Sequence, residues 1–167
     1  MTLASDDMGD NRDPLVSEAE VLLAYLNRMR DAVVRTSEGL ADDQLRAAGV
    51  PSGTNLLGLI QHLTGVEVHW FQRVFLGEDR GINKSMAVPA GVSSDDVVAA
   101  YRQACERSDE IVRGCPDLST QAVGVNPGQE DLKASLRSIV THMIEETARH
   151  AGHADILREQ IDGATGL

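Results

Sequence analysis

Residues 131–160 read DLKASLRSIVTHMIEETARHAGHADILREQ, and this stretch determines the expected fold. Its apolar residues recur every three or four positions, which is the pattern of an amphipathic helix packed against a core. The apolar stripe consists of Leu132, Leu136, Ile139, Met143, Ala154, Leu157 and Ile161. We therefore expect a long helix over about 131–160 with one buried face.

Three further stretches have the same helical spacing, at about 17–39, 54–77 and 93–114. The second contains Gly58 and Gly65, which we expect to allow close approach of a neighbouring helix. Long connections follow the second and third stretches, and no segment alternates as a strand would. The sequence predicts an all-α fold, a four-helix bundle with long crossover loops.

The length and composition fit one globular domain. The chain has 167 residues, 42% of them hydrophobic and only 3% aromatic, which is enough for one core built from aliphatic side chains. We expect a single domain over 14–167. The acidic start at 1–13 is expected to be a disordered lead-in.

Charge and hydropathy exclude several classes of function. The formal charge of −11 disfavours nucleic-acid binding, because such a surface repels phosphate backbones. No apolar run reaches the length of a membrane span, and the N-terminal residues do not form a secretory signal. Cys105 and Cys115 provide no disulfide framework. A cytoplasmic protein without a membrane partner is expected.

The polar residues of the 131–160 helix do not all face solvent. On a helical wheel, His150 falls inside the apolar stripe and Glu146 at its edge. His142, Arg149 and His153 flank this pair. A buried carboxylate needs a cation or a hydrogen-bond network, so Glu146 and His150 are expected to have partners inside the bundle.

The 54–77 helix supplies candidate partners. His62 lies at the rim of its apolar face, His69 lies further out, and Glu67 lies in the middle. His62 with Glu146 and His150 would offer three nitrogen and oxygen ligands to a divalent metal, with Glu67 as an acceptor behind them. A structural hydrogen-bond network would explain the same pattern, and the residues alone leave both interpretations open.

Two segments resemble the DinB-like superfamily, in the branch of the mycothiol S-transferases and of the metal-binding domain of mycothiol-dependent maleylpyruvate isomerase. They are NLLGLIQHLTGVEVHWFQRVFLGE (55–78) and SLRSIVTHMIEETARHAGHADILREQIDGATG (135–166). Members are four-helix bundles, often dimeric, that bind a divalent metal, commonly zinc or nickel. Many use three histidines, and the branch resembled here has Glu at the middle position.

Carried over by position, the resemblance implies His62, Glu146 and His150 as metal ligands. It further implies that the metal-bound thiolate of a low-molecular-weight thiol, mycothiol, is the nucleophile, and that no protein side chain acts as one. The thiolate would attack a small apolar electrophile, as in detoxification by thiol conjugation. His142, Arg149 and His153 are candidates for positioning the thiol or moving protons.

Two other functions remain open at this stage. The same ligands would serve a metal-dependent hydrolase with water as the nucleophile, or a non-catalytic metal-binding stress-response protein. The isomerases of this branch have an additional C-terminal domain, whereas this sequence ends soon after the last helix, so an isomerase is not expected. The resemblance leaves a homodimer open.

Overall fold

The structure is a computed structural model that describes residues 17–128 and 133–165. Within these ranges it is helical and contains no strand, only an isolated bridge between Gln121 and Ser135. The all-α prediction is confirmed. The expected lead-in over 1–13 lies outside the described residues, as do residues 131 and 132 of the last predicted helix.

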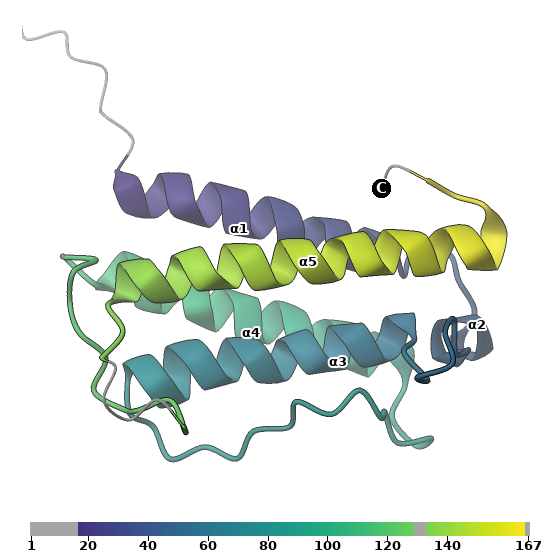
Figure 1. The fold of residues 1–167 in the computed structure, drawn as a ribbon, viewed down its shortest axis with the longest axis horizontal. Coiled ribbons are helices and arrows are strands. Elements are labelled where there is room, and N and C mark those ends of the chain that lie inside the picture. Colours follow the sequence, from purple (N-terminus) through teal and green to yellow (C-terminus); the bar gives the residue numbers. More distant parts are fainter. Residues whose placement is uncertain (1–16, 129–132, 166–167) are drawn as a thin grey trace, which may run out of the picture.

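Four long helical segments form the bundle (Figure 1). They are α1 (Glu18–Arg35), α3 (Leu56–Glu67) with its continuation η1 (Val68–Phe75), α4 (Ser94–Gly114) and α5 (Leu136–Asp162). A short helix, α2 (Asp42–Arg46), lies in the connection between α1 and α3. Helices α1 and α5 run in one direction, and α3 and α4 run in the other (Figure 1).

The direction of α4 explains the first long connection. Because α3 and α4 are parallel, the chain must return along the bundle before α4 begins, and the linker over 76–93 runs back beside α3 (Figure 1). The Gln61 side chain donates to the main-chain oxygens of Ser85 and Ala87, at 2.9 and 2.8 Å. The predicted crossover is therefore a segment held against α3.

The two glycines of α3 make room for this linker. A Cβ at Gly58 would lie 2.3 Å from the main-chain oxygen of Met86, and one at Gly65 would lie 2.1 Å from that of Asn83. The prediction that these glycines allow a close approach is confirmed, but the prediction that a helix approaches them is wrong. The glycines contact the linker, not a neighbouring helix.

Helix α5 begins later than expected from its apolar spacing. Its N-cap is Ser135, whose hydroxyl accepts from the Ser138 amide at 3.2 Å. The preceding residues bond a loop instead, since the Ala122 amide donates to the Ala134 oxygen at 2.8 Å. At the other end, Gly163 has a positive φ of 79° and terminates the helix.

The core consists of two apolar clusters with polar side chains between them. One cluster includes Leu26, Phe71 and Met143, and the other includes Leu63 and Leu157. At the level between them the helices contribute buried polar residues, namely Arg30, Glu67, Ser108, Thr147 and His150. Among the described residues, no helix is long and apolar enough to cross a membrane.

Candidate metal centre

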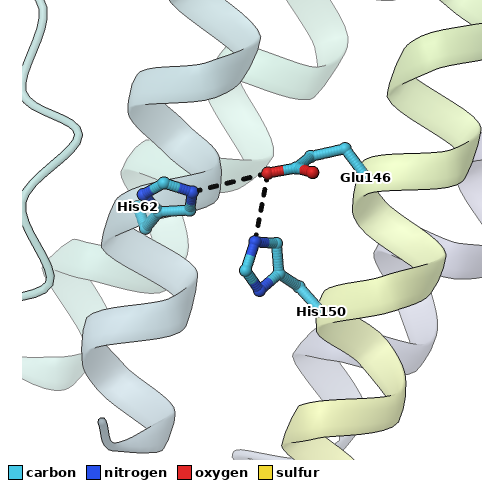
Figure 2. A group of neighbouring side chains, drawn as sticks. All are labelled: His62, Glu146 and His150. Carbon is cyan, nitrogen blue, oxygen red and sulfur yellow. Dashed lines mark hydrogen bonds and ion pairs between the residues drawn. The ribbon is translucent and has the colours of Figure 1, made fainter. Parts of the chain in front are cut away.

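The three predicted ligand residues lie together between α3 and α5 (Figure 2). The Oε1 atom of Glu146 is 3.1 Å from Nε2 of His150 and 3.6 Å from Nε2 of His62. Glu146 and His150 are one turn apart on α5, and His62 reaches them from α3. The structure thus brings together the residues that the sequence grouped, and metal binding by them stays a prediction.

The linker fixes the orientation of His62. Nδ1 of His62 is 2.8 Å from the main-chain oxygen of Lys84, so this nitrogen carries the proton and donates. Nε2 is then the nitrogen that faces Glu146. A carbonyl that accepts from the far nitrogen of a histidine is the usual support of a metal ligand.

His150 is buried and favours its neutral form. Desolvation by burial lowers the pKa of His150, although attraction to Glu146 opposes the shift. Its Nδ1 is buried, and residues 17–128 and 133–165 offer it no hydrogen-bond partner. Neutral imidazole is the form that binds metals, so the lowered pKa of His150 favours the metal-binding form.

Glu146 is ionised and held at both oxygens. Desolvation would raise the pKa of Glu146, but His150, Arg149 and His62 together hold that pKa below its usual value. Oε1 faces the two histidines, whereas Oε2 accepts from Nη1 of Arg149 at 3.3 Å. A single carboxylate oxygen is thus directed into the site.

The donor set fits a divalent ion. Two neutral imidazoles and one carboxylate are suitable ligands for zinc or nickel. Ligand atoms around zinc at ~2.1 Å would lie roughly 3.4 Å apart, and those of His62, Glu146 and His150 all lie within 4.8 Å of one another. Small side-chain adjustments would therefore suffice, and three ligands leave a position open for a substrate.

Arg149 lies at the outer edge of the site. Its guanidinium donates to Glu145 at 2.6 Å as well as to Glu146, and it is exposed. The expectation that it flanks the pair is met. Its described contacts are those of a residue that positions the Glu146 carboxylate.

An aromatic row extends from η1 to α5. The Trp70 ring contacts His69 on one side and His142 on the other, with ring centroids 5.2 and 4.7 Å apart. His142 is one turn before Glu146 on α5. The structure thus places His142 against Trp70, beside the three candidate ligands and not among them.

His69 is more deeply buried than its wheel position predicts. It is 3% exposed, and its Nε2 lies 2.9 Å from Oδ1 of Asn126. A loop from beyond α4 covers this part of η1, since the amides of Val123 and Gly124 donate to the main-chain oxygens of Phe75 and Val74, at 2.9 Å each. A helical wheel gives the face of a residue on its own helix and not what a loop covers, so the expectation that His69 lies further out was wrong.

Glu67 is engaged elsewhere. Its Oε1 and Oε2 accept from Nε and Nη2 of Arg30 at 2.8 and 2.7 Å, and Oε2 also accepts from the Ser108 hydroxyl at 2.7 Å. Arg30 in turn donates to Asp109 at 2.7 Å. In the ranges that the structure describes, no hydrogen bond joins Glu67 to the candidate ligands. The expected acceptor behind the metal is instead the centre of a buried ion-pair network.

His153 is exposed at the other end of the site. Its ring centroid is 5.5 Å from that of His150, and it lines a cavity with Ile156 and Leu157.

The sequence analysis missed the support that Lys84 gives to His62, because the group involved is a main-chain carbonyl. Gly58 and Gly65 were the available signal, since they indicated a segment packed closely against α3.

Comparisons with known proteins agree with this architecture. The family model described as mycothiol-S-transferase matches residues 21–163, which include all three candidate ligands. No curated protein matches the chain. A crystal structure described as a conserved protein from Enterococcus faecalis is similar, with a TM-score of 0.55 and 10% identity over 89% of this chain and 99% of that one. At this identity the likeness shows the fold alone.

Proposed function

The chain belongs to the mycothiol-S-transferase family, a DinB-like family, and from this membership we propose that it is a divalent-metal-dependent thiol S-transferase. Its substrates would be mycothiol and a small apolar electrophile. The observation that carries the proposal is the convergence of His62, Glu146 and His150 at one point between α3 and α5.

A bound divalent ion would lower the pKa of a coordinated thiol, so that the thiolate forms near neutral pH. The protein's own contribution is to hold the ligands before substrate arrives. Lys84 sets the tautomer of His62, Arg149 anchors one oxygen of Glu146, and burial keeps His150 neutral. Because these groups are positioned in advance, little reorganisation is needed on binding.

Cys105 is a poor nucleophile, which supports an external thiol. Burial raises the pKa of Cys105 strongly, and Glu67 raises it further. Cys115 is partly buried, and its Sγ donates to the main-chain oxygen of Asp117 at 3.2 Å. The reactive sulfur is the thiolate, so the raised pKa of Cys105 makes this thiol slow to react. Cys105→Ala and Cys115→Ala should therefore retain transferase activity.

The proposal is tested by thiol consumption. Protein stripped with chelator and reloaded with zinc or nickel is given mycothiol and chlorodinitrobenzene. The thiolate sulfur forms a bond to the ring carbon, and chloride leaves with its bonding electrons. We expect metal-dependent turnover with mycothiol, little with glutathione, and loss of turnover in Glu146→Gln but not in Glu145→Gln.

Other results of this assay would replace the proposal. Ester hydrolysis without loss of thiol would favour the hydrolase that uses the same ligands. Stoichiometric metal binding with neither reaction, across several electrophiles, would favour a non-catalytic metal-binding protein.

A further inference from the structure

A second feature lies beside the candidate metal centre, along α5. It is a cavity of about 270 Å³ between the loop that precedes α3 and the C-terminal half of α5. Its lining residues are Val50, Thr54, His153, Ile156 and Leu157. Small-molecule sites are concave and mostly apolar with few polar groups, and this lining has that character.

Apolar side chains are left open to solvent at this cavity. Val50 is 38% exposed and Ile156 is 56% exposed, and both line this one cavity. Leu157 forms the floor and is 4% exposed. A ligand covering Val50 and Ile156 would remove apolar surface from water, which is a favourable process.

The opposite wall is held in place. A Cβ at Gly49 would lie 2.2 Å from Cδ2 of Leu157, so the loop backbone rests directly on the floor. Within the loop, the Gly49 amide donates to the Thr54 oxygen at 3.0 Å, and the Gly53 amide donates to the Val50 oxygen at 2.9 Å. The cavity is therefore formed before any ligand binds.

The cavity borders the candidate metal centre at His153. The His153 ring lines the cavity and lies 5.5 Å from the His150 ring, centroid to centroid. The helical rise places Ile156 roughly 9 Å from His150 along α5. A molecule with its reacting atom beside His150 would need an apolar tail of about that length to reach Ile156.

We propose that this cavity binds the apolar tail of the electrophile in the proposed transfer reaction, with His153 at the junction between tail and reacting carbon. The inference rests on the proposed function and adds a substrate class to it, electrophiles with an extended apolar tail. Mycothiol carries sugar hydroxyls and does not match an aliphatic lining. His153, expected from the sequence to contact the thiol, is thereby assigned to the electrophile.

Terminal epoxides of increasing length, from propylene oxide to octene oxide, provide the kinetic test. The thiolate sulfur bonds to the terminal carbon, the carbon–oxygen bond breaks, and the oxygen takes the electron pair and then a proton from water. We expect kcat/KM to rise by about two- to fourfold per methylene until the cavity is filled.

The substitutions are made at exposed positions, so that a change in activity does not come from impaired folding. Ile156→Trp should fill the cavity, lower kcat/KM for octene oxide by about tenfold and leave that for propylene oxide nearly unchanged. Val21→Trp is the matched control, because Val21 is also an exposed aliphatic residue, on α1. It should keep the wild-type dependence on length.

Binding is measured without catalysis by titrating metal-free protein with the diol of octene oxide, which is unreactive. Methyl resonances of Val50, Ile156 and Leu157 should shift saturably, while those of Val21 should not. If these methyls shift but thiol is consumed with neither the epoxides nor chlorodinitrobenzene, the proposed function fails and the cavity assignment stands. If epoxides are consumed with no dependence on length and no selective shifts, or a second copy of the chain covers Ile156 in solution, the cavity assignment is overturned.

Discussion

Nδ1 of His62 donates to the main-chain oxygen of Lys84 over 2.8 Å, across 22 residues of sequence. This bond joins the linker over 76–93 to the candidate ligand on α3. It determines which nitrogen of His62 faces Glu146. The conformation of the linker is therefore part of the site, even though no linker side chain is among the candidate ligands.

Moving the linker should weaken metal binding. In Gly65→Ala, the added Cβ would lie 2.1 Å from the Asn83 oxygen and 3.1 Å from the Lys84 nitrogen, so the peptide that holds His62 must shift. Loss of such support typically lowers metal affinity by about 10- to 100-fold. Titration with zinc against a competing chelator measures the change.

Gly152→Ala is the control for this experiment. Gly152 is also inside a helix, two positions from His150, but no atom of the described residues beyond its chain neighbours and its own helix backbone lies within 4 Å of an added Cβ. Removing an exposed helical glycine should stabilise the fold by up to about 1 kcal/mol with unchanged zinc affinity. Equal affinities of Gly65→Ala and Gly152→Ala would contradict the role given to Lys84.

Glu146 should make thermal stability depend on metal. An ion that binds only the native state adds about 3 kcal/mol at a hundredfold excess over Kd. For a domain of this size that is roughly 5–10 °C in Tm. Chelator should lower Tm in wild type and in Glu145→Gln by this amount, and should have little effect in Glu146→Gln or His150→Ala. Identical chelator shifts in wild type and Glu146→Gln would remove Glu146 from the ligand set.

The network around Glu67 should govern stability and not metal content. Arg30 and Glu67 are both almost fully buried, and breaking such a pair leaves an uncompensated charge. Glu67→Gln should cost about 3 kcal/mol, since Asp109 still pairs with Arg30. Denaturant unfolding measures this cost, and elemental analysis should find the wild-type metal content. Glu18→Gln, which breaks an exposed pair with Arg137, should barely change the midpoint. If Glu67→Gln loses metal, Glu67 acts as the acceptor behind the metal ligands that the sequence predicted.

His69 should make the metal-free protein less stable in mild acid. Burial lowers the pKa of His69, although Asn126 opposes the shift. The unfolded chain then binds a proton more readily, beginning near the ordinary histidine pKa of about 6.5. The stability contributed by neutral His69 is present above that pH and is lost as pH falls through the lower folded-state pKa.

The measurement is Tm in chelator from pH 7.5 to pH 5, compared between variants. His69→Gln cannot titrate at this position, so its Tm should fall less steeply with acid than that of wild type. His153→Gln removes an exposed histidine and should follow wild type. Parallel curves for wild type and His69→Gln would show that burial of His69 does not contribute to acid sensitivity.

The sequence predicted those features that depend on periodicity within one helix. Apolar spacing located the four bundle helices, and the positions of Glu146 and His150 on the wheel indicated that both face inward. The rim position of His62 on its own helix suggested it as their partner, and the resemblance implied these three residues as metal ligands. The start of α5 was misplaced because the capping hydroxyl of Ser135 and the loop pairing of Ala134 outweigh apolar spacing there.

The features that the sequence did not predict depend on contacts between distant segments. The partner of Glu67 is Arg30 on α1, and no spacing rule links residues on separate helices. The burial of His69 depends on Asn126 and its neighbours in a loop that follows α4. The bond from His62 to Lys84 involves a main-chain oxygen, which every residue has, so no residue type could signal it.

The central claim is that His62, Glu146 and His150 hold a metal at which an external thiol is activated. X-ray absorption at the zinc edge, on protein lacking both Cys105 and Cys115, tests it most directly. We predict nitrogen and oxygen neighbours alone before mycothiol is added, and a sulfur neighbour at ~2.3 Å afterwards. A spectrum that shows no sulfur neighbour at saturating mycothiol would contradict the account.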